Sequence, residues 1–193
     1  MNIRRATESD IDGVMLIYEQ VKLDRAKLGD NGYEARVQKE GFLLGLDDRE
    51  NYQKLLTEAY SFLVAEENDK VVGYLVADHR DKFYDDEYKT WFDQKYKDIY
   101  YNDPLAMSLA TIATDPSMPG KGVATALLKV LEEKLKGEGF KYLYSIITMA
   151  PLTNCPTIVW HTKNEFKRLA MGRPRERFFD LDWYSGVLLY KFL

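Results

Sequence analysis

The sequence predicts one domain of mixed α/β (α+β) class, and three patterns support this class. An N-terminal strand is followed at once by an amphipathic helix. Two β-rich runs flank a short polar turn, and a third β-type run leads through a glycine-rich loop into a helix and another apolar strand. No repeat and no linker rich in Gly, Ser or Pro divides the 193 residues, so we expect a single domain over residues 1–193.

Composition and charge exclude several classes of protein. Apolar residues make up 46% of the chain and charged residues 30%, as in globular proteins and unlike collagen-like or disordered chains. The net charge of −4 disfavours binding to nucleic acid. Cys155 is the single cysteine, so we expect neither an internal disulfide nor a metal site rich in cysteine. No apolar run approaches the roughly 18 residues that span a membrane, and we expect a cytoplasmic protein.

The N-terminal elements follow from hydrophobic periodicity. Asn2 to Arg5 is expected to be a short strand, and Thr7 to Asp10 resembles a capping box before a helix. Apolar residues from Ile11 to Val21 then recur at helical spacing. A second helical stretch is expected from Asn51 to Tyr60.

A hairpin and an unusual insert come next. The β-rich runs Phe62–Ala65 and Val71–Val76 enclose the polar turn Glu67–Asp69, which predicts two antiparallel strands. The following stretch, at about residues 80–103, mixes aromatic and acidic side chains, with the aromatic ones at helical spacing. We expect a helical insert that packs on the core; the alternative is a pocket wall that attracts a cationic substrate.

A strand, loop, helix and strand in succession carry the chemistry. The run Ser108–Thr114 leads through a loop that contains Gly120 and Gly122 into a helix that starts at Val123 and has Gly137 as its C-cap. The apolar run Tyr142–Thr148 is typical of a central parallel strand. A glycine-rich turn before a helix exposes unpaired amides that favour a phosphate, although a purely structural turn is the alternative.

Spacing argues against two familiar phosphate loops at this point. A Walker A loop requires Ser or Thr directly after its Lys, but Gly122 follows Lys121. The dinucleotide fingerprint requires a third glycine where Thr125 stands. Both ATP and NAD are therefore disfavoured, and a nucleotide-binding domain is only a third alternative.

The order of elements and the loop resemble the GNAT acyltransferase family. Gly122 and Ala124 match its pyrophosphate signature, Arg/Gln-x-x-Gly-x-Gly/Ala, whereas Pro119 stands at the Arg/Gln position. The family pattern Asn-x6-Tyr-x4-Phe is met at Asn154 and Phe166, with His161 in place of the Tyr. The resemblance extends over most of the chain, from about residue 3 to residue 166.

This resemblance implies a mostly antiparallel central sheet with a splayed parallel strand pair and flanking helices. The splayed pair would admit acetyl-CoA as co-substrate, with no metal. Asn154 would bind the pantetheine arm or hold the strands open. The resemblance assigns the pantetheine to the backbone of Ile112, Ala113 and Thr114, and the pyrophosphate to the amides of Gly120, Lys121, Gly122, Val123, Ala124 and Thr125.

The implied reaction is direct attack of a primary amine, of a small molecule or a peptide, on the thioester. A carboxylate or an ordered water chain would take the amine proton, and Glu66 is one candidate, although a solvated turn residue is the alternative. His161 and Tyr184 are the candidate catalytic acids for the leaving thiolate. Each also has a packing role as its alternative.

The departures at Pro119 and His161 keep a second function open, a non-catalytic acyl-CoA-binding or regulatory module. Six basic residues between Lys163 and Arg177 predict a solvated surface, or a contact to the 3′-phosphate of CoA. The runs Arg177–Tyr184 and Val187–Tyr190 are expected to close the sheet as a hairpin. The sequence leaves open a homodimer.

Overall fold

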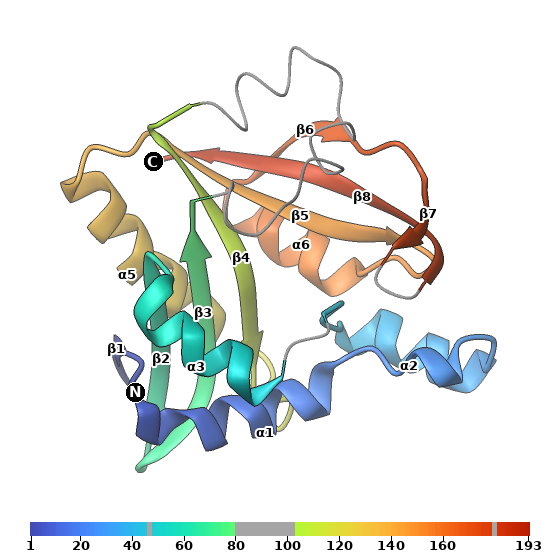
Figure 1. The fold of residues 1–193 in the computed structure, drawn as a ribbon, viewed down its shortest axis with the longest axis horizontal. Coiled ribbons are helices and arrows are strands. Elements are labelled where there is room, and N and C mark those ends of the chain that lie inside the picture. Colours follow the sequence, from blue (N-terminus) through green and yellow to red (C-terminus); the bar gives the residue numbers. More distant parts are fainter. Residues whose placement is uncertain (46–47, 80–102, 179–180) are drawn as a thin grey trace.

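A computed structural model describes residues 1–45, 48–79, 103–178 and 181–193 (Figure 1). Apart from Asp103, the expected aromatic and acidic insert lies outside the described residues. The described strands form one sheet in the order β1-β2-β3-β4-β5-β8-β6, and β7 pairs with β8. Their bounds are β1 Asn2–Arg5, β2 Ser61–Glu67, β3 Lys70–Asp78, β4 Ala106–Thr114, β5 Tyr142–Ala150, β6 Lys167–Met171, β7 Arg175–Phe178 and β8 Leu181–Phe192.

The fold class expected from the sequence is confirmed. All neighbouring pairs in the described sheet are antiparallel except β4 and β5. The helices that flank the sheet are α1 Ile11–Val21, α2 Asn31–Glu40, α3 Arg49–Glu58, α5 Val123–Gly137 and α6 Cys155–Lys163. None of the helices in the described ranges is long and apolar enough to cross a membrane.

Two hydrophobic clusters hold helices against opposite faces of the sheet (Figure 1). Side chains alternate between the faces of a strand, so Phe62 and Val64 of β2 pack with α1 and α3, whereas Leu63 and Ala65 pack with α5. On the α3 side, the hydroxyls of Tyr52 and Tyr74 lie 2.8 Å apart and satisfy each other inside the core. The site elements β4 and α5 are therefore fixed by a packed core.

Several expected elements are confirmed, and others need correction. The first strand, the capping box before the first helix, that helix and the hairpin lie where the sequence predicts. The second helix runs from Arg49 to Glu58, slightly earlier than expected. Gly137 is the last residue of α5, and Glu138 is the C-cap. The left-handed glycine that follows the helix is Gly139, at φ 86°.

Three elements, α2, α6 and β6, were missed and one was misdivided. Helix α2 is weakly amphipathic, so periodicity does not reveal it, although the Asp30 carboxylate caps its start by accepting from Gly32 and Tyr33. Strand β6 was missed as well. The expected closing hairpin had its second run from Val187, but β8 is continuous from Leu181 to Phe192 and inserts between β5 and β6. The hairpin partner is β7, paired with the start of β8.

Candidate cofactor and catalytic site

Strands β4 and β5 part after only a short parallel contact. Their register covers Ala106 to Ser108 opposite Tyr142 to Tyr144. Beyond this point β4 continues against β3 as far as Thr114, and β5 continues against β8 as far as Ala150. Figure 1 shows the two strands diverging toward the end of α1. The later half of β4 therefore has a sheet neighbour on one side only.

The hydrogen-bond alternation of β4 decides which backbone groups face this opening. The N–H of Asp115 donates to the carbonyl of Val72 at 3.0 Å, so this residue pair is of the hydrogen-bonded type. Residues two apart share this orientation in an antiparallel ladder, which turns the N–H and C=O of Ala113 toward β3. Ile112 and Thr114 turn theirs toward the opening. Of the three residues expected to pair with pantetheine, these two turn their backbone groups away from β3, and the described strands offer them no pairing partner.

A cleft of about 170 Å³ lies along the later half of β4, where β4 has parted from β5. Ile112, Ala113 and Thr114 line it together with Ala124 of α5. The opposite walls consist of Val21 at the end of the predicted helix α1, residues Glu40 to Leu43 at the end of α2 and after it, and Pro156, Thr157 and Trp160 from α6. The sequence did not indicate α2 or α6.

Helix α5 starts beside this cleft without a cap. Its N-cap residue Gly122 has φ 76° and ψ 11°, and no side chain caps the first turn. Gly120 is also left-handed, at φ 73°. A Cβ on either glycine would meet nothing within 4 Å, so backbone conformation and not crowding requires glycine here. The first amides of α5 and the positive end of its dipole are open to an anion.

Trp160 ties α6 to the same helix start. Its Nε1 donates to Oγ1 of Thr125 at 3.2 Å. Thr125 therefore has a structural role besides any amide contact to a ligand. The flanking residues differ in exposure, since Lys121 is exposed and Val123 is buried.

Asn154 is buried where α6 begins. Its Nδ2 donates to the carbonyl of Phe42 at 2.7 Å, which ties the start of α6 to the cleft wall that follows α2. Its Oδ1 is buried and has no hydrogen-bond partner in the part of the chain that the structure describes. A Cβ on Gly41, a cleft residue, would lie 3.4 Å from this oxygen. Asn154 thus fixes the cleft wall that follows α2, and its Oδ1 remains available as a hydrogen-bond acceptor beside the cleft.

His161 is packed inside the protein and does not line the cleft. Its Nδ1 donates to the carbonyl of Thr157 at 2.8 Å, so Nε2 carries the lone pair. This nitrogen is buried and meets no hydrogen-bond partner among residues 1–45, 48–79, 103–178 and 181–193. The rings of Trp160 and Phe166 stand edge-on at 4.8 and 4.7 Å. Burial lowers the pKa of His161 to about 4. A neutral imidazole with this tautomer favours the packing role over the expected acid role.

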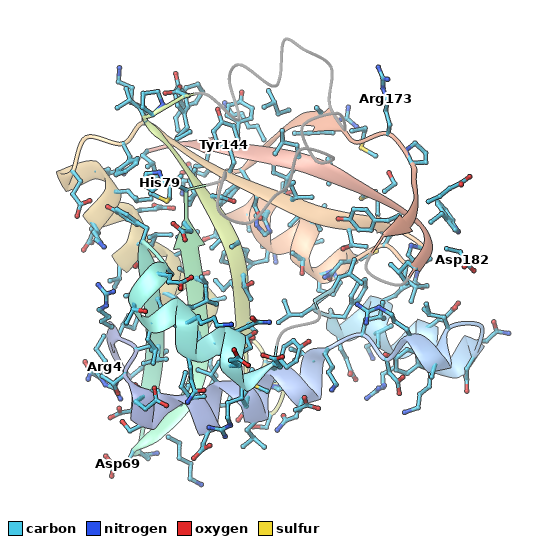
Figure 2. All side chains as sticks on the ribbon, viewed as in Figure 1. Arg4, Asp69, His79, Tyr144, Arg173 and Asp182 are labelled. Atoms are coloured by element: carbon cyan, nitrogen blue, oxygen red, sulfur yellow. The ribbon has the colours of Figure 1, made fainter. Side chains whose placement is uncertain are left out.

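Tyr184 and Glu66 lie apart from the cleft. Tyr184 is buried in a cluster with Ala106, Tyr144 and Leu188, beside the pairing of β7 and β8. Glu66 accepts from Nε of Arg4 at 3.1 Å, near the start of α1. Figure 2 shows Arg4 at the outer edge of the sheet and Tyr144 near the point where β4 and β5 part. The structure therefore gives Glu66 an ion-pair role.

The basic run lies on the far arm of the sheet. Lys163, Lys167, Arg168 and Arg173 are exposed, on the end of α6 and along the β6 edge. Figure 2 shows Arg173 projecting outward there. Strand β6 is separated from β4 by β8 and β5, whereas the glycine loop follows β4 directly. This placement favours a solvated surface.

Comparisons with known proteins agree with this geometry. Residues 32–166 match the model of the acetyltransferase (GNAT) family. No curated protein matches the sequence. A ribosomal-protein-alanine N-acetyltransferase from Brucella melitensis is similar in structure, with 21% identity, a TM-score of 0.63 and 100% of each chain covered.

Two further similar structures were solved with ligands. The PaiA N-acetyltransferase from Thermoplasma acidophilum, in complex with coenzyme A, has 12% identity and a TM-score of 0.62, with 100% of this chain and 98% of that chain covered. A phosphinothricin acetyltransferase from Sinorhizobium meliloti, in complex with acetyl-CoA, has 16% identity and a TM-score of 0.61, with 100% and 88% covered. At these identities the likeness shows the fold.

Proposed function

The chain belongs to the acetyltransferase (GNAT) family, and we propose that it is an acetyl-CoA-dependent N-acetyltransferase acting on a primary amine of a small molecule or a peptide. The observation that carries this proposal is the opening between β4 and β5, with its cleft and the uncapped start of α5 at one end. Acetyl-CoA, as the co-substrate, supplies the acetyl group as a thioester.

Three features of the chain fit such a molecule. The outward N–H and C=O groups of Ile112 and Thr114 can pair with the amides of an extended arm, as an added strand pairs with a sheet edge. The buried, unpartnered Oδ1 of Asn154 can accept from an amide N–H. The amides at residues 120–125 can hold a diphosphate, because charge and hydrogen-bond donors coincide at a helix start.

The chemistry requires the acceptor nitrogen to be uncharged when it attacks. A primary amine has a pKa near 10, so a carboxylate or a water chain must take its proton. A backbone N–H from Ile112 or Thr114 is suited to stabilise negative charge on the thioester oxygen, since a fixed donor needs no reorganisation. His161 and Tyr184 stay proposals as proton donors. Because both are buried and neither lines the cleft, protonation of the leaving thiolate by solvent is the alternative.

The test is thiol release from acetyl-CoA by the purified protein with a panel of primary amines. Release that depends on the amine, together with the acetylated amine by mass spectrometry, supports the proposal. The control is a variant with a blocked loop, Gly122→Val. No release with any amine, combined with no binding of acetyl-CoA, rejects both the enzyme and the cofactor site.

A second function has one specific observation in its favour. His161 replaces the Tyr of the family pattern and is buried and neutral, so the expected proton donor is lacking at that position. A non-catalytic acyl-CoA-binding or regulatory module would keep the cleft and lose the chemistry. Tight binding of acetyl-CoA without turnover on any amine distinguishes this module from the enzyme.

A further inference from the structure

A second cavity, which the proposed function does not use, lies between the end of α1 and α2. Its volume is about 530 Å³, within the range of small-molecule sites. Its lining is charged and includes two tyrosines, Tyr18 and Tyr33. The charged lining residues among those described are the cations Lys22, Arg25, Lys27 and Arg36 and the carboxylates Glu19 and Asp24.

Most of the positive charge in this cavity is balanced by the protein itself. Three of the four cations have a carboxylate within ion-pair distance. These pairs are Lys22 with Glu19 at 2.6 Å, Lys27 with Asp24 at 2.9 Å, and Arg36 with Glu40 at 4.0 Å. Within the described ranges, Arg25 has no such partner.

Arg25 is also poor in hydrogen bonds. A guanidinium carries five N–H donors. One of them, on Nη2, donates to the carbonyl of Gly45 at 3.4 Å, and the hydroxyl of Tyr18 donates to the same carbonyl at 3.1 Å. Among the described residues, the Nε of Arg25 is buried and has no acceptor. Within that part of the chain, the side chain is therefore held in place but keeps unused donors and a charge with no carboxylate in ion-pair distance.

Tyr33 adds a second unused donor to the lining. Its hydroxyl oxygen accepts from the N–H of Asp24 at 2.6 Å. No acceptor for the hydroxyl hydrogen exists among the residues that the structure describes. A hydroxyl and a guanidinium with free donors match the oxygen atoms of a carboxylate or a phosphate.

A single layer of backbone separates this cavity from the cofactor cleft. The N–H of Leu43 donates to the carbonyl of Val21 at 2.9 Å, and the N–H of Leu23 donates to that of Leu43, also at 2.9 Å. Val21 and Leu43 line the cleft, whereas Leu23 and Gly45 line the cavity. A small molecule bound in the cavity thus lies beside the cofactor site.

We propose that the cavity around Arg25 binds a carboxylate or phosphate group of the acceptor, so that the substrate is a primary amine that also carries an anion. This inference rests on the proposed acetyl transfer. Arg25 and Tyr33 bind the anionic end, and the amine end reaches around the wall formed by residues 21–23 and 43–45. Arg25 then determines specificity without taking part in the chemistry.

Matched acceptors test the proposal. The rate of thiol release is measured with 4-aminobutyrate against butylamine, and with phosphoethanolamine against ethanolamine. We expect kcat/KM of the wild type to favour the anionic member of each pair by about tenfold or more, the value of a hydrogen bond to a charged group. Arg25→Gln should abolish this preference mainly through KM. Lys27→Gln, which removes an exposed cation of the same cavity, should retain it.

Each other outcome is decisive as well. Equal kcat/KM within both pairs, or a preference unchanged in Arg25→Gln, overturns the anion site and leaves acetyl transfer standing. If Arg25→Gln does not fold, Arg25→Lys is tested in its place, because lysine keeps the positive charge but lacks the forked N–H donors of the guanidinium.

A binding measurement separates this failure from failure of the proposed function. Inorganic phosphate and butyrate are titrated into the wild type and Arg25→Gln by calorimetry, with and without 4-aminobutyrate. Binding to the wild type alone, with competition by 4-aminobutyrate, supports the site even if no amine is acetylated. Anion binding without competition by 4-aminobutyrate shows a site for free anions and overturns the acceptor assignment. The absence of any anion binding overturns it as well.

Discussion

Helices α1 and α5 pack on opposite faces of the sheet, and their starts differ in whether the protein itself satisfies the polar groups there. A 3-10 turn, Glu8–Asp10, leads into α1, and there the protein satisfies its own polar groups: the Asp10 carboxylate accepts from the N–H of Thr7 at 2.8 Å and from two nitrogens of Arg4 at 2.7 and 2.8 Å. Within the described residues, the side chain of Asp10, the N-cap residue of α1, caps none of the amides of α1 itself. At the start of α5 a left-handed glycine replaces any capping side chain. Both helices are anchored by buried apolar faces.

The difference separates structural from functional helix starts. An open helix start costs stability, since capping side chains contribute about 1 kcal/mol and satisfy amides that are otherwise unpaired. The chain has a capping box in the turn that leads into α1, where no ligand is expected, and no capping side chain among the described residues at α5, beside the cleft. The open start thus indicates a site because it adjoins a cleft and a free strand edge, and not by itself.

The largest effect is expected at the open start. Gly122→Val places a β-branched side chain at φ 76° and in the space that a diphosphate would occupy. We expect the affinity for CoA to fall about a hundredfold, as for loss of several charge-assisted hydrogen bonds. Calorimetric titration measures it. Gly139→Val is the control, because Gly139 has φ 86° and open space but follows α5; equal affinity in both variants would contradict the loop assignment.

At the closed start the expected effect is on stability. Hydrogen bonds from Arg4 lower the pKa of Asp10 from 3.8 to about 2. Because the folded pKa is depressed, the carboxylate contributes about 2 kcal/mol above pH 4, and this is lost as the pH falls toward 2. Urea unfolding of Asp10→Asn at pH 7 should show this loss with unchanged CoA affinity. If Asp10→Asn were as stable as the wild type but bound CoA more weakly, the polar groups before α1 would serve binding and not stability, which would contradict the comparison.

The third prediction asks whether His161 serves packing or chemistry. Its pKa of about 4 lies below the ordinary 6.5, so the unfolded state binds a proton more readily. Stability is complete above pH 6.5 and falls as the pH drops toward 4, by about 2 kcal/mol at pH 5. Urea unfolding at pH 7.5 and 5 should show this dependence in the wild type and its loss in His161→Phe.

Kinetics of the same variant complete the test. If His161 were the proton donor, His161→Phe would lower turnover with little change in CoA affinity. If His161 serves packing, turnover and CoA affinity should change together in His161→Phe. The pH profile of the rate should then show the same ionisations near pH 6 to 7 in the variant as in the wild type.

The smallest effect is expected at the start of α6. This start combines a structural hydrogen bond, as before α1, with a polar atom beside the cleft that is unpaired in the described part of the chain, as at α5. Asn154→Ala removes the bond to Phe42 and the reserve acceptor Oδ1. We expect CoA affinity to fall about tenfold, the value of one or two hydrogen bonds. Asn164→Ala is the matched control, because Asn164 Nδ2 donates to the carbonyl of Trp160 at 2.8 Å at the other end of α6. An equal fall in the control would assign both residues to helix stability alone.

Local patterns allowed much of the fold to be predicted. The capping box at Thr7, the hairpin and α5 depend on residues close in sequence, and each lies where the pattern placed it apart from small shifts at its ends. Helix α2 was missed because its few apolar residues pack in a small separate cluster around Tyr33 and Val37. Strand β8 was divided because Ser185 and Gly186 interrupt its apolar pattern, although pairing with β5 continues through them.

By itself, the sequence carried the resemblance to the family. Local conformation and short spacing predicted the first helix, the hairpin and the glycine loop before α5, but not α2, α6 or β6. Only the tertiary structure decided that β4 and β5 part after Ser108, that Ile112 and Thr114 face the opening, and that His161 is buried and neutral. It alone also placed Arg25 in a cavity where, among the described residues, no carboxylate lies within ion-pair distance of it. These properties depend on which distant segments meet, and so on the burial and pairing that no local pattern records.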